Sequence, residues 1–241
     1  MAKKGQSKHQ KRLSASPTLK LPRKTEPWIT KPSPGPHSSE SCIPLATIIR
    51  DYLEITRTTR EANKILSEGE IQVDGRVRKN PEFPVGFMDI IQVERTGKSW
   101  RVTYDEKGYL TLHEIPEDES KFKLAKIEGK NQFKGGKIQL AFHDGKTALG
   151  DFKKMNIGDV VKLNLPELEV SDHLPLEEGK IALITGGSNV GKIGTILEIR
   201  GQEKASQELI SLEVEGETLQ APEEYVFVIG EKKPIISLPG D

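Results

Sequence analysis

The sequence has almost none of the residues that build disulfides and zinc clusters. Cys42 is the single cysteine among 241 residues, which excludes an intramolecular disulfide and a cysteine-cluster zinc site. The histidines are scattered along the chain without metal-ligand spacing, at His9, His37, His113, His143 and His173. We therefore expect no metal and no other cofactor.

Long apolar runs are also missing. The chain has no apolar stretch of about 18 residues, so we expect no membrane span, and no apolar signal-peptide core follows Met1. The hydrophobic content of 34% is low and the charged content of 30% is high, which favours several small cores over one large core. This composition indicates a cytosolic protein with on the order of two or three small domains.

The balance of charge hides a strong segregation. Lys plus Arg and Asp plus Glu both number 36, but residues 1–37 hold nine basic residues against one acid, Glu26. Subtraction leaves 27 bases and 35 acids in residues 38–241, so a +8 arm precedes a −8 body. A basic arm of this kind suits a polyphosphate partner, from which it displaces counterions.

The arm has too few apolar residues to fold alone. Its prolines remove backbone donors and interrupt any helix, at positions Pro17, Pro22, Pro27, Pro32, Pro34 and Pro36. We expect a segment that is disordered in the free protein and extended when it binds nucleic acid. A solvated tail is the alternative, and a mitochondrial transit peptide is a second one, although the prolines oppose its amphipathic helix.

Two helices and a hairpin are predicted after the arm. Pro44 suits the first position of a helix, and apolar residues then repeat with helical spacing through residue 53. Thr58 and Glu61 form a capping-box pattern for a second helix, which Gly69 ends. Asp74-Gly75 then predicts a type I′ turn between two short strands.

Basic residues gather on this helix–hairpin segment. Arg57, Arg60 and Lys64 fall opposite the apolar face of the second helix, and the hairpin sets Arg76 and Arg78 side by side. A solvated face neutralised by nearby glutamates is the alternative. The run from Leu53 to Val77 closely resembles the S-four-type RNA-binding domain, and this resemblance implies that the face contacts RNA.

Residues 95–170 show a period near two, with turn signals between short segments. This pattern predicts a small antiparallel barrel or sheet. The glycines of the Asn131–Lys137 run allow close approach to a phosphate, with Lys134 and Lys137 flanking them; a flexible loop is the alternative. His143-Asp144 opens a glycine turn without a nucleophile nearby, so we expect no catalytic site there.

A false phosphate loop lies near the C-terminus. Residues 186–192 match G-x-x-x-x-G-K, but Ile193 stands where a hydroxyl ligand of magnesium belongs, and a strand pattern follows in place of a helix. We reject nucleotide hydrolysis. The spacing from Gly179 to Ile196 resembles the KOW motif, which implies an SH3-like barrel with Asn189 and Lys192 available to RNA at a loop tip; a plain glycine hairpin is the alternative.

The order of these modules resembles one family, the archaeal and eukaryotic small-subunit ribosomal proteins called S-four-e. The resemblance implies a mostly β protein with a small α+β module, divided into an extended basic arm (1–41), an S-four-type αα-hairpin module (42–95), a β-rich barrel-like centre (96–172) and a KOW SH3-like domain with its tail (173–241). The RNA-contacting candidates are basic residues plus one amide: Lys3, Lys4, Lys8, Lys11, Arg12, Arg23, Lys24, Lys31, Arg57, Arg60, Lys64, Arg76, Arg78, Lys134, Lys137, Asn189 and Lys192.

The resemblance implies a structural, non-enzymatic constituent of the small ribosomal subunit that supports translation. Its expected partners are small-subunit ribosomal RNA and neighbouring ribosomal proteins in the cytoplasm, with no membrane and no small-molecule substrate. An RNA-modifying enzyme or a KOW-type transcription factor would use the same modules. The net acidic body departs from the usual basic composition of ribosomal proteins and predicts an acidic face turned to solvent.

Overall fold

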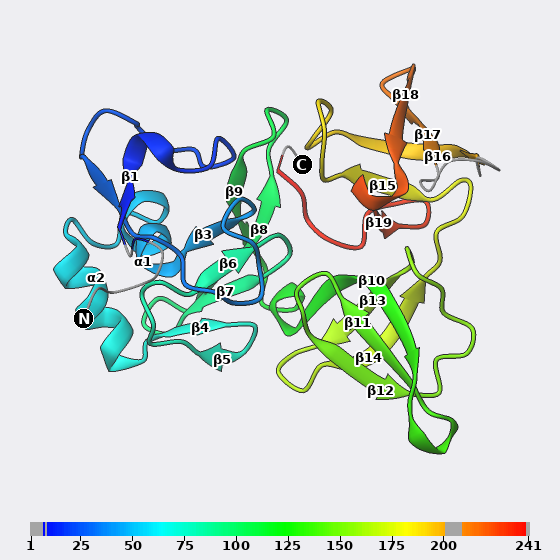
Figure 1. The fold of residues 1–241 in the computed structure, drawn as a ribbon, viewed down its shortest axis with the longest axis horizontal. Helices are drawn as coiled ribbons and strands as arrows, with labels where there is room; N and C mark the ends of the chain where they lie inside the picture. The colour runs from blue at the N-terminus through cyan, green and yellow to red at the C-terminus, as the bar shows by residue number, and fades with distance from the viewer. Residues whose placement is uncertain (1–6, 8, 201–208, 240–241) are drawn as a thin grey trace.

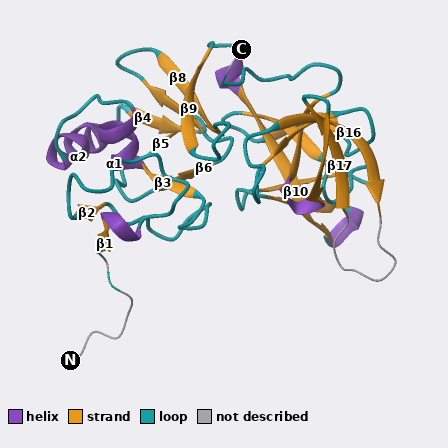
Figure 2. Ribbon diagram, turned by 90° about the horizontal axis from the view of Figure 1, so that it is seen from above, coloured by secondary structure: helices purple, strands orange, loops and turns teal. Residues whose placement is uncertain are grey.

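The chain folds into several small β-sheets with few helices (Figure 1). This computed structural model describes residue 7 and residues 9–200 and 209–239. The described strands form three five-stranded and two two-stranded sheets, so the predicted mostly β class is confirmed. Figure 2 shows α1 and α2 at one end of the molecule and β16 and β17 at the other. No helix in the described ranges has the length and apolar character to cross a membrane.

A short helical segment opens the helix–hairpin unit. α1 (Leu45–Thr47) continues directly into a π-helical turn, η2 (Ile48–Tyr52). The side chains of Leu45, Ile48 and Ile49 are buried, as their spacing predicts. This segment packs against the second helix, α2.

α2 (Thr59–Glu68) has both of its predicted end signals. The Glu61 amide donates to Thr58 Oγ1 at 3.2 Å, and the Glu61 carboxylate accepts from the Thr58 amide at 3.3 Å. Gly69 ends the helix with φ of 85°, a left-handed conformation that glycine adopts without strain. Ala62 and Leu66 are buried, which fixes the helix on its apolar face.

The hairpin that follows belongs to a larger sheet. Asp74 and Gly75 have φ of 51° and 70°, the two positive values that a type I′ turn requires. The sheet order is β5-β4-β7-β8-β9, so pairing continues across residue 95, between two of the predicted domains. The strands are β4 (Ile71–Val73), β5 (Arg76–Val77), β7 (Ile90–Val93), β8 (Lys98–Tyr104) and β9 (Leu110–Ile115), and a separate pair joins β3 (Cys42–Pro44) to β6 (Pro84–Gly86).

The central region has its own five-stranded sheet. Its order is β12-β11-β10-β13-β14, and all neighbouring strands are antiparallel. A separate cluster of buried side chains, including Ile127, Leu140 and Phe142, forms its core. The strands are β10 (Phe122–Gln132), β11 (Ile138–Phe142), β12 (Thr147–Gly150), β13 (Val160–Asn164) and β14 (Glu169–Leu174).

The third five-stranded sheet lies at the C-terminal end, in the order β18-β17-β16-β15-β19. Its strands are β15 (Ile181–Ile184), β16 (Ile193–Arg200), β17 (Leu209–Val214), β18 (Glu217–Pro222) and β19 (Val226–Gly230). Residues 185–192 join β15 to β16, and no helix follows the G-x-x-x-x-G-K sequence, in agreement with the rejection of a nucleotide site. Single 3₁₀ turns occur at η1 (Arg12–Ser14), η3 (Glu119–Lys121), η4 (Lys134–Gly136) and η5 (Glu223–Tyr225).

The described part of the arm packs on the body, which corrects the expectation of a free, disordered segment. β1 (Gln10–Lys11) pairs with β2 (Trp28–Ile29), and the Leu110 amide donates to the Thr18 carbonyl at 2.8 Å. Apolar side chains of the arm, namely Ala15, Leu19, Leu21 and Ile29, are buried in the main core. They are too few to build a core alone, but they cover apolar residues of the body.

Candidate nucleic-acid interface

The outer face of α2 carries exposed cations. Arg60 and Lys64 are exposed on the helix, and exposed Arg57 stands just before the N-cap Thr58, while Ala62 and Leu66 on the other side are buried. The amphipathic packing of the helix therefore fixes the direction in which Arg60 and Lys64 point.

The hairpin adds further cations beside this helix. Arg76 is exposed, whereas Arg78 is half-buried with its guanidinium carbon 4.5 Å from the centre of the Phe83 ring. Lys79, which is not among the predicted RNA contacts, also lies here. Its side chain passes close to Gly69 at the end of α2, with Cε 3.4 Å from the position that a Cβ on Gly69 would occupy. The sequence could have indicated this, because Lys79 directly follows Arg78 in the predicted hairpin.

Most of these charges are not neutralised by acids. Within the described ranges, Arg57, Arg60 and Arg76 form no ion pair, and Lys64 approaches Glu68 only at 3.9 Å. Glu61 accepts from the backbone amides of Arg57 and Thr58, and these hydrogen bonds, with a smaller contribution from the Arg57 charge, lower the pKa of its carboxyl. The arrangement suits the binding of phosphate groups in solvent.

We define the helix–hairpin face as Arg57, Arg60, Lys64, Arg76 and Lys79. Figure 1 places α2 and β5 at the same end of the molecule, beside the arm.

The arm's cations fall into two groups. Lys11 and Lys24 are exposed, and Lys31 is half-buried with Nζ donating to the Ser7 carbonyl at 2.6 Å. Three further candidates, Lys3, Lys4 and Lys8, lie outside the described residues. The exposed lysines remain predicted RNA contacts.

Arg12 and Arg23 form the second group, which is turned inward. Only 2% of Arg12 is exposed, and its Nε donates to the Pro22 carbonyl at 2.7 Å while Nη2 reaches Asp51 at 3.4 Å. Arg23 donates to the carbonyls of Ala15 and Ser16 at 2.7 and 2.6 Å. Both guanidinium groups therefore hold the arm in its folded path.

The arm also presents an aromatic side chain that charge counting missed. Trp28 is 53% exposed and lies opposite Lys11 in the β1–β2 pair. A large exposed indole next to a lysine is suited to stacking on an unpaired base. The sequence could have indicated this contact, because a tryptophan is unusual in so polar and proline-rich a segment.

The two glycine-containing candidate loops differ in accessibility. At the β10–β11 turn Gly135, Gly136 and Lys137 are exposed, while the side chain of Lys134 lies outside what the structure describes. In the β15–β16 loop Asn189 and Lys192 are half-buried, because Gly191 packs against the backbone of Asp105. Neither loop adjoins α2 in Figure 1, so the candidates do not form one continuous patch.

A buried charge cluster joins the helix–hairpin sheet to the central sheet. Lys123 on β10 is fully buried, and its Nζ lies 2.8 Å from Asp74, 2.8 Å from Asp89 and 2.6 Å from Asp144. Lys146 pairs with Asp74 and Asp144. The three carboxylates are spaced closely enough to hold a metal ion, but the Lys123 ammonium lies among them as the cation.

The cluster sets the protonation of its neighbours. Lys123 holds the pKa of Asp89 well below its usual range against the effect of burial, and likewise lowers that of Asp144 to about 2. Burial and the Lys123 charge lower the pKa of His143 to about 4. The Lys126 amide donates to Nδ1 of His143 at 3.2 Å, and Nε2 faces the Phe87 carbonyl at 3.3 Å, which fits a neutral ring.

Family models match three successive segments of the chain. The RS4NT domain matches residues 4–40, the S4 domain matches residues 44–91, and the ribosomal family S4e matches residues 96–170. The S4 match spans the helices and all five residues of the helix–hairpin face. These matches cover more than half of the chain.

Relatives match along almost the whole length. The small ribosomal subunit protein eS4 of Methanothermobacter thermautotrophicus is 44% identical over 241 residues, covering 100% of this chain and 99% of the relative. That of Archaeoglobus fulgidus is 45% identical over 235 residues, covering 95% and 97%. The crystal structure of the 30S ribosomal protein S4e from Thermoplasma acidophilum superposes with a TM-score of 0.69 at 36% identity, covering 79% of this chain and 96% of that one.

The fold and the exposed cations describe a mostly β protein with a face of exposed basic side chains. The chain belongs to the S4e family of ribosomal proteins, which are structural proteins and not enzymes. This confirms the resemblance to the S-four-e family that the order of the modules indicated.

Proposed function

We propose that this protein binds small-subunit ribosomal RNA through the helix–hairpin face and supports the folded particle in the cytoplasm. The observation that carries the proposal is the set of exposed arginines without an ion pair in the segment matched by the S4 domain, namely Arg57 just before α2, Arg60 on α2 and Arg76 on β5. The exposed arm residues Lys11, Lys24 and Trp28 extend the contact. Neighbouring ribosomal proteins are the further partners.

The finer architecture belongs to the same proposal. We infer that the two-helix segment with the β4–β5 hairpin is an S-four-type module, supported by the S4 match at residues 44–91. We infer that β15–β19 form a KOW-type SH3-like barrel, supported by five antiparallel strands and the glycine loop after β15. The division near residue 95 follows the family matches, although β7 and β8 pair across it.

The test is a double substitution on the helix–hairpin face. Arg60→Ala with Arg76→Ala removes two exposed cations, so the slope of log K against log salt for small-subunit RNA should fall in magnitude by about 1.4–1.8. The free energy of unfolding should change by less than about 0.5 kcal/mol, because both side chains lie on the surface. Filter binding at several salt concentrations and urea unfolding measure the two effects.

The matched control is Arg95→Ala with Lys98→Ala. These residues are exposed on the same sheet but pair with Glu70 and Glu114, so RNA affinity should change little. Equal losses in both variants would show that only net charge matters and would contradict a defined face. Association with small subunits through a high-salt wash separates a ribosomal constituent from an RNA-modifying enzyme or a transcription factor.

A further inference from the structure

The hairpin between β10 and β11 projects from the central sheet (Figure 1). Residues 122–126 of β10 pair with β13, but residues 127–132 pair with β11 alone. The tip is closed by the Phe133 amide, which donates to the Lys137 carbonyl at 2.8 Å. A Cβ built on Gly135 or Gly136 would meet no described atom within 4 Å beyond its chain neighbours. The tip therefore has a closed frame and stands free of the neighbouring strands.

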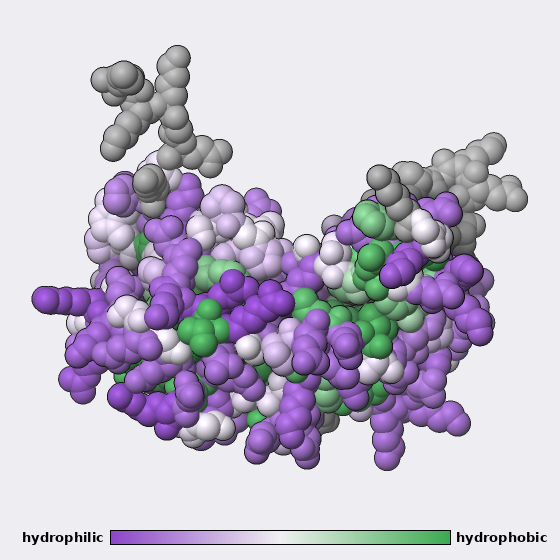
Figure 3. Space-filling view, turned by 90° about the horizontal axis from the view of Figure 1, so that it is seen from below, coloured by the Kyte–Doolittle hydropathy of each residue, from purple (hydrophilic) through white to green (hydrophobic). Residues whose placement is uncertain are grey.

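Phe133 presents an aromatic ring at the start of this tip. It is 52% exposed, and it is the one exposed phenylalanine among the seven in the chain. No described ring or cationic group packs on it, and the preceding Asn131 and Gln132 are exposed and polar. Figure 3 shows the lower face of the view in Figure 1 as mostly hydrophilic, with apolar side chains in small separate areas. An isolated ring among polar groups suits stacking on a base better than docking on an apolar protein surface.

Lysines flank the hairpin. Lys137 at the tip is exposed, and Lys153 and Lys154 are exposed after β12. The Lys130 ammonium donates to the carbonyls of Lys153 and Met155 at 3.0 and 2.6 Å, which holds the segment after β12 beside the stem of the hairpin. Within the described ranges Lys137 and Lys154 form no ion pair. These ammonium groups are available to phosphates.

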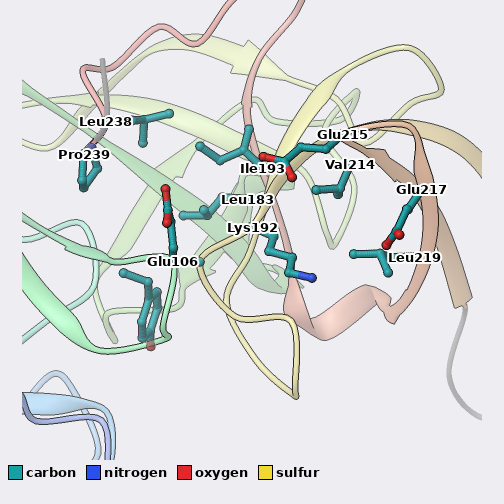
Figure 4. A pocket seen from close by; sticks show the side chains of 12 residues that line it. Glu106, Leu183, Lys192, Ile193, Val214, Glu215, Glu217, Leu219, Leu238 and Pro239 are labelled. Carbon is teal, nitrogen blue, oxygen red and sulfur yellow. The ribbon is translucent and has the colours of Figure 1, made fainter.

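The charge of this region is opposite to that of the body around it. Residues 129–157 hold six lysines against two acids, a net charge of +4. Subtracting this +4 from the −8 of residues 38–241 leaves −12 for the rest of the body. Figure 4 shows part of that acidic excess, with Glu106, Glu215 and Glu217 around a cavity of about 500 Å³ at the C-terminal sheet. An anionic ligand is therefore attracted to the hairpin region and repelled from the cavity.

The buried charge cluster fixes the position of the hairpin. Lys123 lies at the start of β10 and pairs with Asp74 and Asp89 of the helix–hairpin unit. Phe133 lies about 30 Å further along this chain segment, at a strand rise of about 3.3 Å per residue. The tip is therefore held at a distance from the helix–hairpin face, and a ligand at one place is distinct from a ligand at the other.

We propose that the β10–β11 tip is a second RNA site, at which Phe133 stacks on an unpaired base while Lys137 and Lys154 contact phosphates beside it. An aromatic ring stacks on any base and lysines contact the backbone, so the site takes single-stranded RNA without a set sequence. A duplex binds there through its phosphates alone, because its base faces are covered. The proposal rests on RNA as the ligand of the protein, but it uses no residue of the helix–hairpin face.

The test is fluorescence anisotropy of a labelled oligoadenylate of about 12 nucleotides with the full-length protein. Every protein carries Arg60→Ala with Arg76→Ala, so that the helix–hairpin face contributes less to the signal. In this background Phe133→Ala should weaken binding about tenfold, the size of one lost base stack. Phe133→Trp should bind at least as tightly as the background protein. Phe133→Leu keeps an apolar side chain without a flat ring and should bind as weakly as Phe133→Ala.

Two controls match these changes. Leu149→Ala removes a side chain of similar exposure, 51%, from β12 of the same sheet, and it should change the affinity less than twofold. Lys137→Gln with Lys154→Gln should lower the magnitude of the salt slope by about 1.4. Lys232→Gln with Lys233→Gln removes two exposed lysines of the C-terminal segment and should leave that slope unchanged. The melting temperatures should not differ, since all of these side chains are exposed.

Several results would overturn the proposal. They are equal affinity with and without the Phe133 ring, an equal loss in Leu149→Ala, tight binding by Phe133→Leu, and equal salt slopes for the two lysine variants. An RNA duplex of the same length that loses as much affinity in Phe133→Ala would also overturn it. If the unsubstituted protein binds no RNA, the proposed function fails; if it binds RNA but the Phe133 variants lose nothing, only this second site fails.

Discussion

Arg60 on α2 and Lys123 on β10 carry the same charge in opposite settings. Arg60 is exposed and lacks an acidic partner among the described residues, whereas Lys123 is fully buried among three carboxylates. The Arg60 side chain is accessible to a ligand, whereas the Lys123 side chain stabilises the contact between two sheets. Burial and pairing therefore decide what a basic residue does, and charge counting cannot separate the two roles.

The largest effect is expected from Lys123→Met. Removing the ammonium takes away the one cation that contacts all three buried carboxylates and leaves them only Lys146 and His37 as partners, so the free energy of unfolding should fall by about 3–5 kcal/mol in urea unfolding at pH 7. Lys121→Met, two residues earlier and exposed, is the control and should cost less than about 0.5 kcal/mol. A loss below about 1 kcal/mol for Lys123→Met would mean that water solvates the cluster.

His143 should give the cluster a pH dependence. Its pKa is lowered from 6.5 to about 4, so its contribution to stability is complete above pH 6.5 and is lost as the pH falls towards 4. The loss over this window is about 3 kcal/mol, at about 1.4 kcal/mol per pH unit. The lowered pKa of Asp144, about 2, places its own loss below pH 3.8, outside the window.

The check is urea unfolding of His143→Gln between pH 7 and pH 4. The variant should lack the slope that the parent protein shows, and His113→Gln should retain it. If the His143 variant keeps the full slope, another group is responsible for the pH dependence.

Two neighbouring arm residues sharpen the comparison further. Arg12→Met removes a buried guanidinium that donates to the Pro22 carbonyl and to Asp51, and it should cost about 1–3 kcal/mol of stability. Thr25 and Arg50 still donate to these two acceptors, so the cost should fall at the lower end of that range. Lys11→Met should leave stability unchanged but reduce the salt slope of RNA binding by about 0.7–0.9. The reverse pattern, with RNA affinity following Arg12 alone, would contradict the inward role of this arginine.

The smallest change in fold is expected when the arm is neutralised without being deleted. Deletion of residues 1–37 would remove Leu19 and Ile29 from the core, so it would confuse charge with stability. Replacing Lys3, Lys4, Lys8, Lys11 and Lys24 by Gln preserves the core, and the salt slope should fall by about 3 if four of them contact phosphates. An unchanged slope would mean that the body holds the RNA alone.

Local signals in the sequence predicted much of the helix–hairpin unit. The capping box at Thr58, the stop at Gly69 and the turn at Asp74-Gly75 each depend on residues a few positions apart. The buried cluster depends on pairs such as Asp74 with Lys123, 49 residues apart, for which no periodic pattern exists. The Asp74-Gly75 pair predicted the turn, but no residue near it in the sequence indicated that Asp74 also pairs with Lys123.

The candidate site was predictable to a similar extent. Helical periodicity placed Arg60 and Lys64 on the outer face, because the apolar residues of one short helix determine its orientation. Arg57, which the same periodicity assigned to the helix, stands before the N-cap Thr58. The same reasoning placed Arg12 and Arg23 among the RNA contacts, and their inward hydrogen bonds depend on how the arm folds back. Lys192 was expected at an open loop tip, but its neighbour Gly191 packs against Asp105 in the β8–β9 turn, and Lys192 is half-buried in a cavity that Glu106 also lines.

The buried cluster has a consequence for how freely this module can be exchanged between proteins. Asp74 and Asp89 come from the helix–hairpin unit, while Lys123, Asp144 and Lys146 come from the central unit. If either unit were transplanted alone, it would carry unmatched charge at the surface where the other unit had been. The segment that the S4 domain matches is therefore tied to its neighbour by buried charge, and recombination would have to move both units together.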